Sequence, residues 1–199
     1  MTASLLSSEF TQALAARITT IRKMPPPIPK QDRQTENLTR VGVNGFLAVG
    51  GKTYLVTDKA RWGAERDGST ELTLFCLNDG SSVFLEWWQD ISLHVQVSKT
   101  RLTLRDIGLA PRNIEEIDET TELSWNGNTY CYDDDLDLEY HKDGQESETP
   151  HIYVFKTKDG QRSLSVQVWD DGDRYDVWAS EMLDPDMVEV LNLGNGAPR

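Results

Sequence analysis

Hydrophobic and polar residues alternate along most of the chain after Val41, in short segments that Gly, Asn and Asp separate. These segments are rich in Val, Tyr, Phe, Trp and Thr, which is typical of antiparallel strands joined by tight turns. The pattern predicts five strands before a connector at 103–116 and five after it. They are expected at 45–49, 52–62, 71–77, 82–88 and 91–97, then at 121–125, 128–140, 151–157, 162–169 and 174–179. A last strand or a short helical turn is expected at 187–191.

The two sets of predicted strands carry the same marks in the same order. Gly-Lys-Thr-Tyr at 51–54 recurs as Gly-Asn-Thr-Tyr at 127–130, and Asp-Gly at 67–68 recurs at 143–144. Segments 74–80 and 153–160 then match in shape, as do 87–90 and 168–171. Such ordered matches predict an internal duplication. The fold expected is mainly β, with two tandem antiparallel five-stranded meanders that form SH3-like small barrels or one continuous sheet, since either hides strand edges.

The start of the chain has a different period. Apolar residues recur at steps of four, four, four and three, which predicts one stripe of an amphipathic helix: Leu6, Phe10, Leu14, Ile18 and Ile21. Prolines at 25–27 and 29 end this helix and begin a stiff spacer. Four roles are open for the helix: packing on the body, docking a partner, lying at a membrane surface, or serving as a cleaved targeting segment.

Charge divides the chain further. The net charge is −13, and the whole excess of negative charge lies in residues 115–199, which hold 22 acidic and six basic residues. Residues 1–40 hold six basic and three acidic residues. The expected organisation is a helix and proline spacer at 1–40, a first β repeat at 41–114, an acidic second repeat at 115–193 and a frayed tail at 194–199. Nucleic acid should be repelled by the acidic body, and a membrane would be met only peripherally.

Candidate catalytic and metal motifs fail on spacing. Gly-Gly-Lys-Thr at 50–53 lacks the earlier glycine of a phosphate-binding loop and predicts a hairpin turn instead. The acidic run at 133–139 cannot wrap a cation from one strand face, so we expect a solvated acidic face. The three histidines have no carboxylate or hydroxyl partner at a recognisable spacing. Cys76 is expected in the core. The spacing of Cys76 and Cys131 matches no metal site and no disulfide framework. This favours a reducing compartment and hence the cytoplasm. We expect no enzyme, no cofactor and no metal.

The tryptophans supply the best surface candidate. Six are present, and core packing explains most of them. Trp87 and Trp88 are adjacent on one predicted strand and therefore point to opposite faces. At least one of them should leave its own core and be available for a partner.

These marks together resemble the bacterial domain family DUF4178. The resemblance covers about residues 41–193: Gly-x-Thr-Tyr-Leu-Val opening a strand, a strand ending Leu-Asn-Asp-Gly, a strand containing Trp, Trp-Asn-Gly-Asn-Thr-Tyr at 125–130, and Trp-Asp-Asp-Gly-Asp-Arg-Tyr-Asp-Val-Trp at 169–178. It implies a β-rich domain without obvious enzymatic character, seen in bacteria beside envelope-stress and phage-shock type genes. The family supplies no catalytic or binding residues to carry over.

The sequence therefore favours a non-catalytic protein-interaction module, an adaptor or assembly factor that the resemblance links to envelope or membrane stress. A protein partner would bind the N-terminal stripe or the Trp87/Trp88 surface. The alternative is a module that binds a small molecule or lipid in a cleft between the two repeats, lined by tryptophans. The oligomeric state is left open by the sequence.

Overall fold

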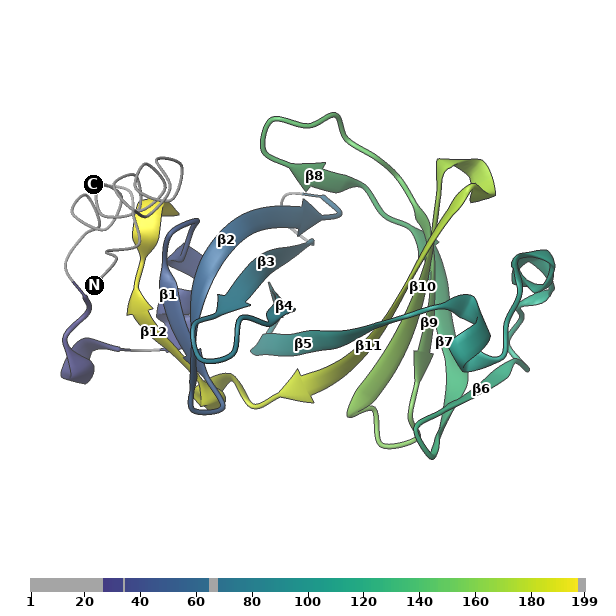
Figure 1. The fold of residues 1–199 in the computed structure, drawn as a ribbon, viewed down its shortest axis with the longest axis horizontal. Coiled ribbons are helices and arrows are strands. Elements are labelled where there is room, and N and C mark those ends of the chain that lie inside the picture. Colours follow the sequence, from purple (N-terminus) through teal and green to yellow (C-terminus); the bar gives the residue numbers. More distant parts are fainter. Residues whose placement is uncertain (1–26, 34, 65–67, 197–199) are drawn as a thin grey trace, which may run out of the picture.

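The computed structural model describes residues 27–33, 35–64 and 68–196, which form one antiparallel sheet of twelve strands (Figure 1). The first half of the chain contributes β1 (Phe46–Val49), β2 (Lys52–Trp62), β3 (Ser69–Cys76), β4 (Ser82–Gln89) and β5 (Leu93–Leu102). The second contributes β6 (Glu122–Trp125), β7 (Asn128–Asp137), β8 (Tyr140–Lys142), β9 (His151–Lys156), β10 (Arg162–Trp169), β11 (Arg174–Leu183) and β12 (Val188–Asn192). All ten predicted strands are present, although the one expected at 128–140 ends at Asp137 and the separate strand β8 was not predicted. The region 187–191 forms most of the last strand.

Short 3-10 turns make up the helical content of the described residues. Two of them, η3 (Leu104–Ile107) and η4 (Pro111–Glu116), form the connector between the halves. The others are η1 (Lys30–Asp32), η2 (Thr35–Arg40), η5 (Asp170–Gly172), η6 (Pro185–Met187) and η7 (Gly194–Gly196). The amphipathic helix predicted for the start of the chain lies outside the described residues. No helix in the described ranges is long and apolar enough to cross a membrane.

The sheet order is β12-β1-β2-β3-β4-β5-β11-β10-β9-β7-β6. Each half is thus a meander. The last strands of the two meanders, β5 and β11, pair with each other in antiparallel orientation. The β5–β11 pairing runs from Val95↔Leu183 to Leu102↔Val177. This pairing joins the two halves into one continuous, unclosed sheet. Of the two arrangements expected, the continuous sheet is therefore confirmed and two separate small barrels are wrong. Joining two edges satisfies their backbone groups as closure of each half would have done.

Equivalent irregularities occur in both halves. The β1–β2 hairpin turns through Gly50 and Gly51, and the β6–β7 hairpin through Asn126 and Gly127, all with positive φ. In β2 the register shifts between Val56 and Asp58, and in β7 it shifts between Tyr132 and Asp134, 76 residues later. A bulge bends and twists a strand, so bulges at equivalent places curve both halves alike.

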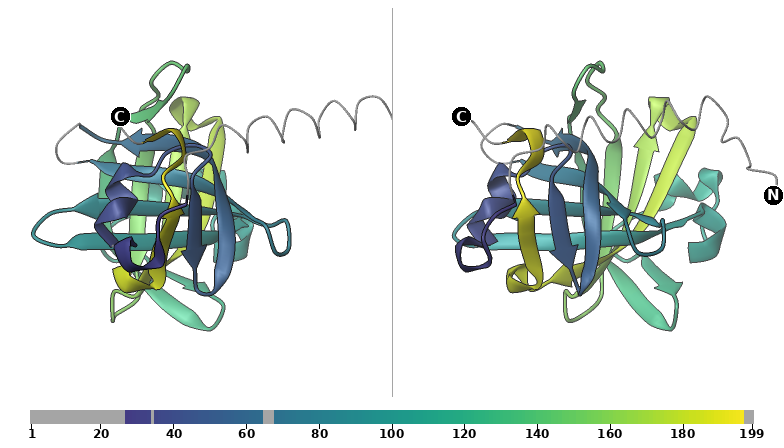
Figure 2. Two further views of the ribbon diagram at one scale, coloured as in Figure 1. Left: turned by 90° about the vertical axis from the view of Figure 1, so that its left-hand side faces the viewer. Right: turned by 60° about the vertical axis from the view of Figure 1, so that its left-hand side comes forward.

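Alternation along the strands places one face of each half against its own core. Tyr54 in β2 and the equivalent Tyr130 in β7 are both buried. The first core also contains Leu38 from η2 and the buried valines of β12, and η2 covers the end of this half beside β12 (Figure 2). The second core is completed by Leu104 and neighbouring residues of η3 and η4. The opposite faces of the two halves meet each other.

The strand β12 belongs spatially to the first half although it is the last strand along the sequence. It pairs with β1 from Phe46↔Asn192 to Val49↔Val188. The residue Val190 is fully buried in the first core. The last strand of the sheet along the sequence thus stabilises the first repeat.

Candidate functional site

The inner faces of the two halves enclose a groove of about 360 Å³. Its floor is the central part of the sheet, and its walls come from β2 to β4 on one side and β7 to β10 on the other. The short strand β8 pairs with the end of β2 at Ala60↔Lys142 and Trp62↔Tyr140, so it links the two walls (Figure 1). The cleft between the repeats, with tryptophans in its lining, is therefore present in the structure.

One end of the groove is filled by three aromatic rings. Trp62, Tyr140 and Trp169 lie with ring centroids 4.5 to 5.9 Å apart. Trp62 and Trp169 are each 6% exposed and form a small core with Ile152. Rings packed this tightly against one another stabilise the contact between the halves.

The middle of the groove contains two glutamates that sequence reasoning missed. Glu71 on β3 and Glu86 on β4 are directly opposite each other across the two strands. The indole N–H of Trp62 donates to Glu71 Oε2 at 3.2 Å, and the Gln96 amide donates to Glu86 Oε2 at 2.6 Å. The hydroxyl of Ser69 donates to Glu86 Oε1. Like charges in direct cross-strand pairs destabilise a sheet, which marks this pair as unusual.

The surroundings favour the neutral form of this pair. Burial, together with the neighbouring Glu86 carboxylate, raises the pKa of Glu71 to about 7 from an ordinary 4.5, although the Trp62 N–H opposes the shift. Burial also raises the pKa of Glu86, against the hydrogen bonds from Ser69 and Gln96. The pKa of Tyr140 rises to about 12 through burial and the nearby charge of Glu71. Strong shifts of this kind concentrate at functional sites.

Other charged side chains that line the groove have partners of opposite charge. Arg174 lies 3.3 Å from Glu148, and its guanidinium carbon lies 4.5 Å from the centre of the Trp169 ring. Asp176 pairs with Arg101. The Lys156 ammonium lies 2.7 Å from Asp133. Among the described residues, Glu71 and Glu86 have no basic side chain within ion-pair distance.

The groove continues toward Trp88. A neighbouring cavity of about 500 Å³ shares Gln96, Lys156 and Ser163 with it and is also lined by Trp88 and Met182. Trp88 stacks on His94 with ring centroids 5.2 Å apart, whereas Trp87 packs against the first core. The two tryptophans thus face opposite sides of the sheet, as predicted, and Trp88 is the one beside the groove.

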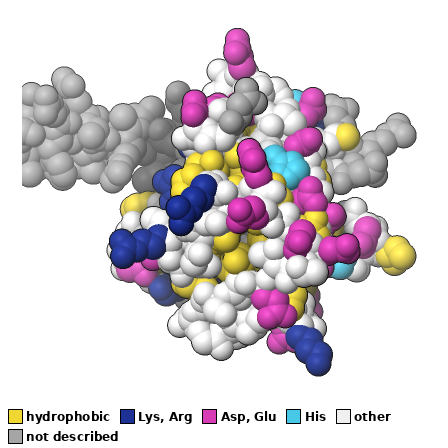
Figure 3. All heavy atoms as spheres, turned by 90° about the vertical axis from the view of Figure 1, so that its right-hand side faces the viewer, with side chains coloured by type: hydrophobic (Ala, Val, Ile, Leu, Met, Phe, Trp, Pro, Cys, Tyr) yellow, Lys and Arg dark blue, Asp and Glu magenta, His cyan; other side chains and the backbone are white. Residues whose placement is uncertain are grey.

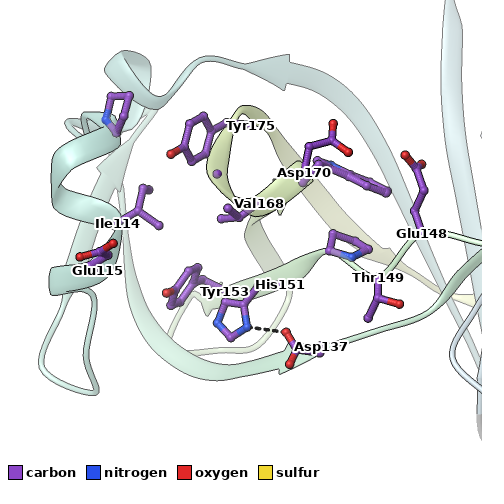
Figure 4. A pocket seen from close by; sticks show the side chains of 14 residues that line it. Ile114, Glu115, Asp137, Glu148, Thr149, His151, Tyr153, Val168, Asp170 and Tyr175 are labelled. Atoms are coloured by element: carbon purple, nitrogen blue, oxygen red, sulfur yellow. Dashed lines mark hydrogen bonds and ion pairs between the residues drawn. The ribbon is translucent and has the colours of Figure 1, made fainter.

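The second half has a more open pocket on its outer side, about 610 Å³ in volume (Figure 4). Tyr153, Tyr175 and Ile114 face it, and His151 lies beside them. Nδ1 of His151 is 2.8 Å from Asp137, and its Nε2 is 3.2 Å from an Asp135 oxygen. On this face of the molecule, acidic side chains border apolar ones on one side and basic side chains lie at the opposite edge (Figure 3). The pocket is exposed and acidic.

The histidines correct one sequence-based expectation. Each has a carboxylate within ion-pair distance: Asp90 beside His94, Glu139 beside His141, and two aspartates beside His151. The His94 pair forms across a turn and the His151 pairs between two strands, whereas His141 pairs with a residue two positions earlier. The segment at 50–53 forms the predicted hairpin turn, and Cys76 is buried as predicted.

Two groups of residues from the sequence analysis have different outcomes. The stripe formed by Leu6, Phe10, Leu14, Ile18 and Ile21 lies outside the described residues. The glutamate pair could have been suspected from Glu86 alone, a single charge between Leu85 and Trp87 on a strand. Its partner Glu71 follows only from the strand register.

Comparison with family models, curated proteins and solved structures found no match. The resemblance to DUF4178 therefore stays a prediction, and the functional argument depends on the groove itself.

Proposed function

We propose that this protein is a non-catalytic binding module that holds a small organic molecule in the groove between its two halves. The observation that carries this proposal is the pair Glu71 and Glu86 on the inner face, opposite each other across two strands. Each of these carboxyls accepts a hydrogen bond from a neighbouring side chain. Removing carboxyl groups from water costs free energy, and apolar side chains would stabilise the contact between the halves better. Retaining the carboxyls in a cavity favours a role in binding.

The size and lining of the groove support the same proposal. Its volume of about 360 Å³ lies in the range of small-molecule sites. Phe84 and Trp178 offer aromatic surface, with ring centroids 4.8 Å apart. The floor offers hydroxyls, for example Ser98 and Ser180, whose oxygens are 2.6 Å apart. Apolar surface with a few convergent polar groups is typical of ligand pockets.

A groove-blocking variant tests this proposal. Ser165 lines the groove and makes no side-chain hydrogen bond among the described residues, so Ser165→Phe should fill the cavity. Ser124→Phe adds the same ring to an exposed position on β6 and is the matched control. Full-length proteins would be incubated with metabolite and lipid extracts and examined by native mass spectrometry.

We expect a bound mass on the wild type and on Ser124→Phe, and its loss on Ser165→Phe. The absence of any bound mass on the wild type, or its retention by folded Ser165→Phe, would contradict the proposal. A mass that comes from the lipid extract would assign the groove to a lipid.

The adaptor remains a second candidate, and the position of Trp88 favours it. Its ring is half-buried and lines the open continuation of the groove. A partner side chain could reach this ring, whereas Trp87 is committed to the first core. Affinity capture with Trp88→Ala, compared with wild type, tests it: loss of one specific partner supports the adaptor, and an unchanged partner set argues against Trp88 as its contact.

The proposed compartment is the cytoplasm. Its support is cysteine chemistry, because Cys76 and Cys131 are both free thiols. Fractionation of the source cells, followed by detection of the full chain in each fraction, would test this placement.

A further inference from the structure

We propose that the groove selects a molecule that carries a protonated nitrogen, an alkylammonium or guanidinium group, and that Glu71 and Glu86 receive this group. The inference rests on the proposed function, since it names the chemistry of the molecule held there. It assigns a charge to the ligand and a role to two side chains.

The glutamate pair lacks a compensating positive charge in the groove. The remaining charges that line the groove are paired: Asp176 with Arg101, Glu148 with Arg174, and Lys156 with Asp133. The glutamate pair has hydrogen-bond donors but no basic side chain within ion-pair distance among the described residues. Lys142, whose charge acts on Glu71, is itself paired with Asp58. A buried charge without a partner is costly, and a bound cation would relieve that cost.

The glutamate pair also has unused hydrogen-bonding capacity. Two carboxylates can accept about eight hydrogen bonds, and three are used here, by Trp62, Ser69 and Gln96. Oε1 of Glu71 accepts none from the described residues. An ammonium has three donors and a guanidinium has five, and neither competes for the donors already present. The free capacity of the pair therefore matches a cationic donor.

Aromatic side chains lie around the glutamate pair. Glu71 is bonded to the Trp62 indole, and Phe84 is two residues from Glu86 on the same side of β4. Trp178 lies against Phe84 across the groove. Organic cations are attracted to aromatic faces and bring apolar carbon with them, unlike a hydrated metal ion. The combination of carboxylates and rings thus favours an organic cation.

A separate observation also points to a ligand in this groove. Trp169 is 6% exposed and lines the groove, and its indole N–H has no hydrogen-bond partner among the described residues. Buried donors are nearly always paired in native proteins. Trp169 lines both the groove and the outer pocket, and its indole nitrogen is itself inaccessible, so an acceptor on a ligand would reach this donor only with a shift of the ring.

The equivalent pair of residues in the second half is not acidic. Counting from the bulges, Glu71 corresponds to Ile152 and Glu86 to Gln167, and these two residues are again directly opposite each other. The second half therefore has an uncharged pair where the first has two carboxyls. The scaffold does not require acids at this position.

The experiment uses full-length, ¹⁵N-labelled protein at pH 8, which lies above the raised pKa of Glu71. The probes are n-butylammonium chloride, n-butylguanidinium chloride and, as a neutral match, 1-pentanol, with sodium chloride as the control for ionic strength. The readout is the position of the tryptophan indole N–H signals. We expect saturable shifts of the Trp62 signal with both cations, at a dissociation constant at least about tenfold below that of 1-pentanol.

Matched variants connect the effect to the pair. Glu71→Gln and Glu86→Gln keep the size of the side chain and one acceptor oxygen but remove the negative charge, and each should weaken cation binding about tenfold. Glu122→Gln, at an exposed position on β6, should leave it unchanged. Two single variants keep the test decisive if one of them fails to fold.

Three results would overturn the inference. Equal binding of 1-pentanol, unaffected by Glu71→Gln, would show that the groove binds apolar molecules without selecting charge, and the proposed function would survive. Stronger shifts of the same signals by magnesium or calcium chloride would assign the pair to a metal ion. Absence of a saturable shift with either cation would reject cation selection, while the extract experiment with Ser165→Phe separately decides whether the groove binds anything.

Discussion

The two halves of this protein share a scaffold and differ on the face where they meet. Both have the same strand order, a bulge at an equivalent place and a buried tyrosine two residues into the second strand. On the inner face, however, the pair Glu71 and Glu86 stands where the second half has Ile152 and Gln167. The features that the two halves share stabilise the fold, whereas the residues in which they differ line the groove.

A second contrast concerns the tryptophan at the end of the fourth strand of each meander. Trp88 is stacked by His94, and Trp169 is covered by Arg174, each from the strand that pairs with it. Trp88 borders an open cavity, whereas Trp169 is buried against Trp62. Of these two equivalent tryptophans, Trp88 thus lies at the surface, whereas Trp169 forms part of the contact between the halves.

The largest expected effect breaks the shared scaffold. Phe155 is fully buried in the second core, so Phe155→Ala should lower the free energy of unfolding by about 3–5 kcal/mol. Because β5 and β11 join the halves, both should unfold in one transition. Urea denaturation followed by tryptophan fluorescence and circular dichroism checks this. Two separate transitions, with only one of them shifted, would show that the halves are independent.

The next effect concerns the charge that only the first half has. The folded-state pKa of Glu71, about 7, lies above the ordinary 4.5, so the folded state binds more protons than the unfolded state between these values. The stability that protonated Glu71 provides is therefore present at pH 4.5 and lost as pH rises to about 7, by up to about 3 kcal/mol.

Glu71→Gln should remove most of this loss, which makes the variant more stable than the wild type at pH 8. Denaturant midpoints at several pH values measure it. A wild type whose stability rises steadily with pH over this range, in parallel with that of Glu71→Gln, would contradict the assignment.

The reverse exchange should have a somewhat smaller effect. Gln167→Glu places a carboxylate opposite Ile152 in the second half, where the neighbouring Asp176 is already acidic. We expect a loss of about 2 kcal/mol at pH 8 and a smaller loss at pH 5, since burial disfavours the charged form. Thermal unfolding at both pH values tests this. Equal losses at both values would point to packing instead of charge.

The smallest effect concerns the paired hairpins. Asn126 has a φ of 49°, which is a left-handed conformation. The equivalent residue in the first half, Gly50, adopts the same conformation. Asn126→Ala should cost about 1 kcal/mol, whereas Asn126→Gly should be nearly neutral. Differential scanning calorimetry of both variants compares them. An alanine variant as stable as the wild type would mean that this turn adopts another conformation without loss.

The sequence by itself determined the local structure of this protein. Strand positions, the turns at 50–51 and 126–127, and the opposite orientations of Trp87 and Trp88 all follow from alternation and turn chemistry within a few residues. The repeat of motifs after 76 residues also indicated two similar halves. These features depend on neighbours along the chain, which a sequence displays directly.

Only the tertiary structure decided how the halves combine. The joining of β5 to β11, the return of β12 to β1 and the reach of β8 to β2 are contacts between distant segments that strand patterns do not encode. The glutamate pair belongs to this class as well, because Glu71 and Glu86 become opposite neighbours only through the register of β3 and β4. Alternation tells which side of a strand a residue faces, and only packing decides whether that side meets water, a core or a groove.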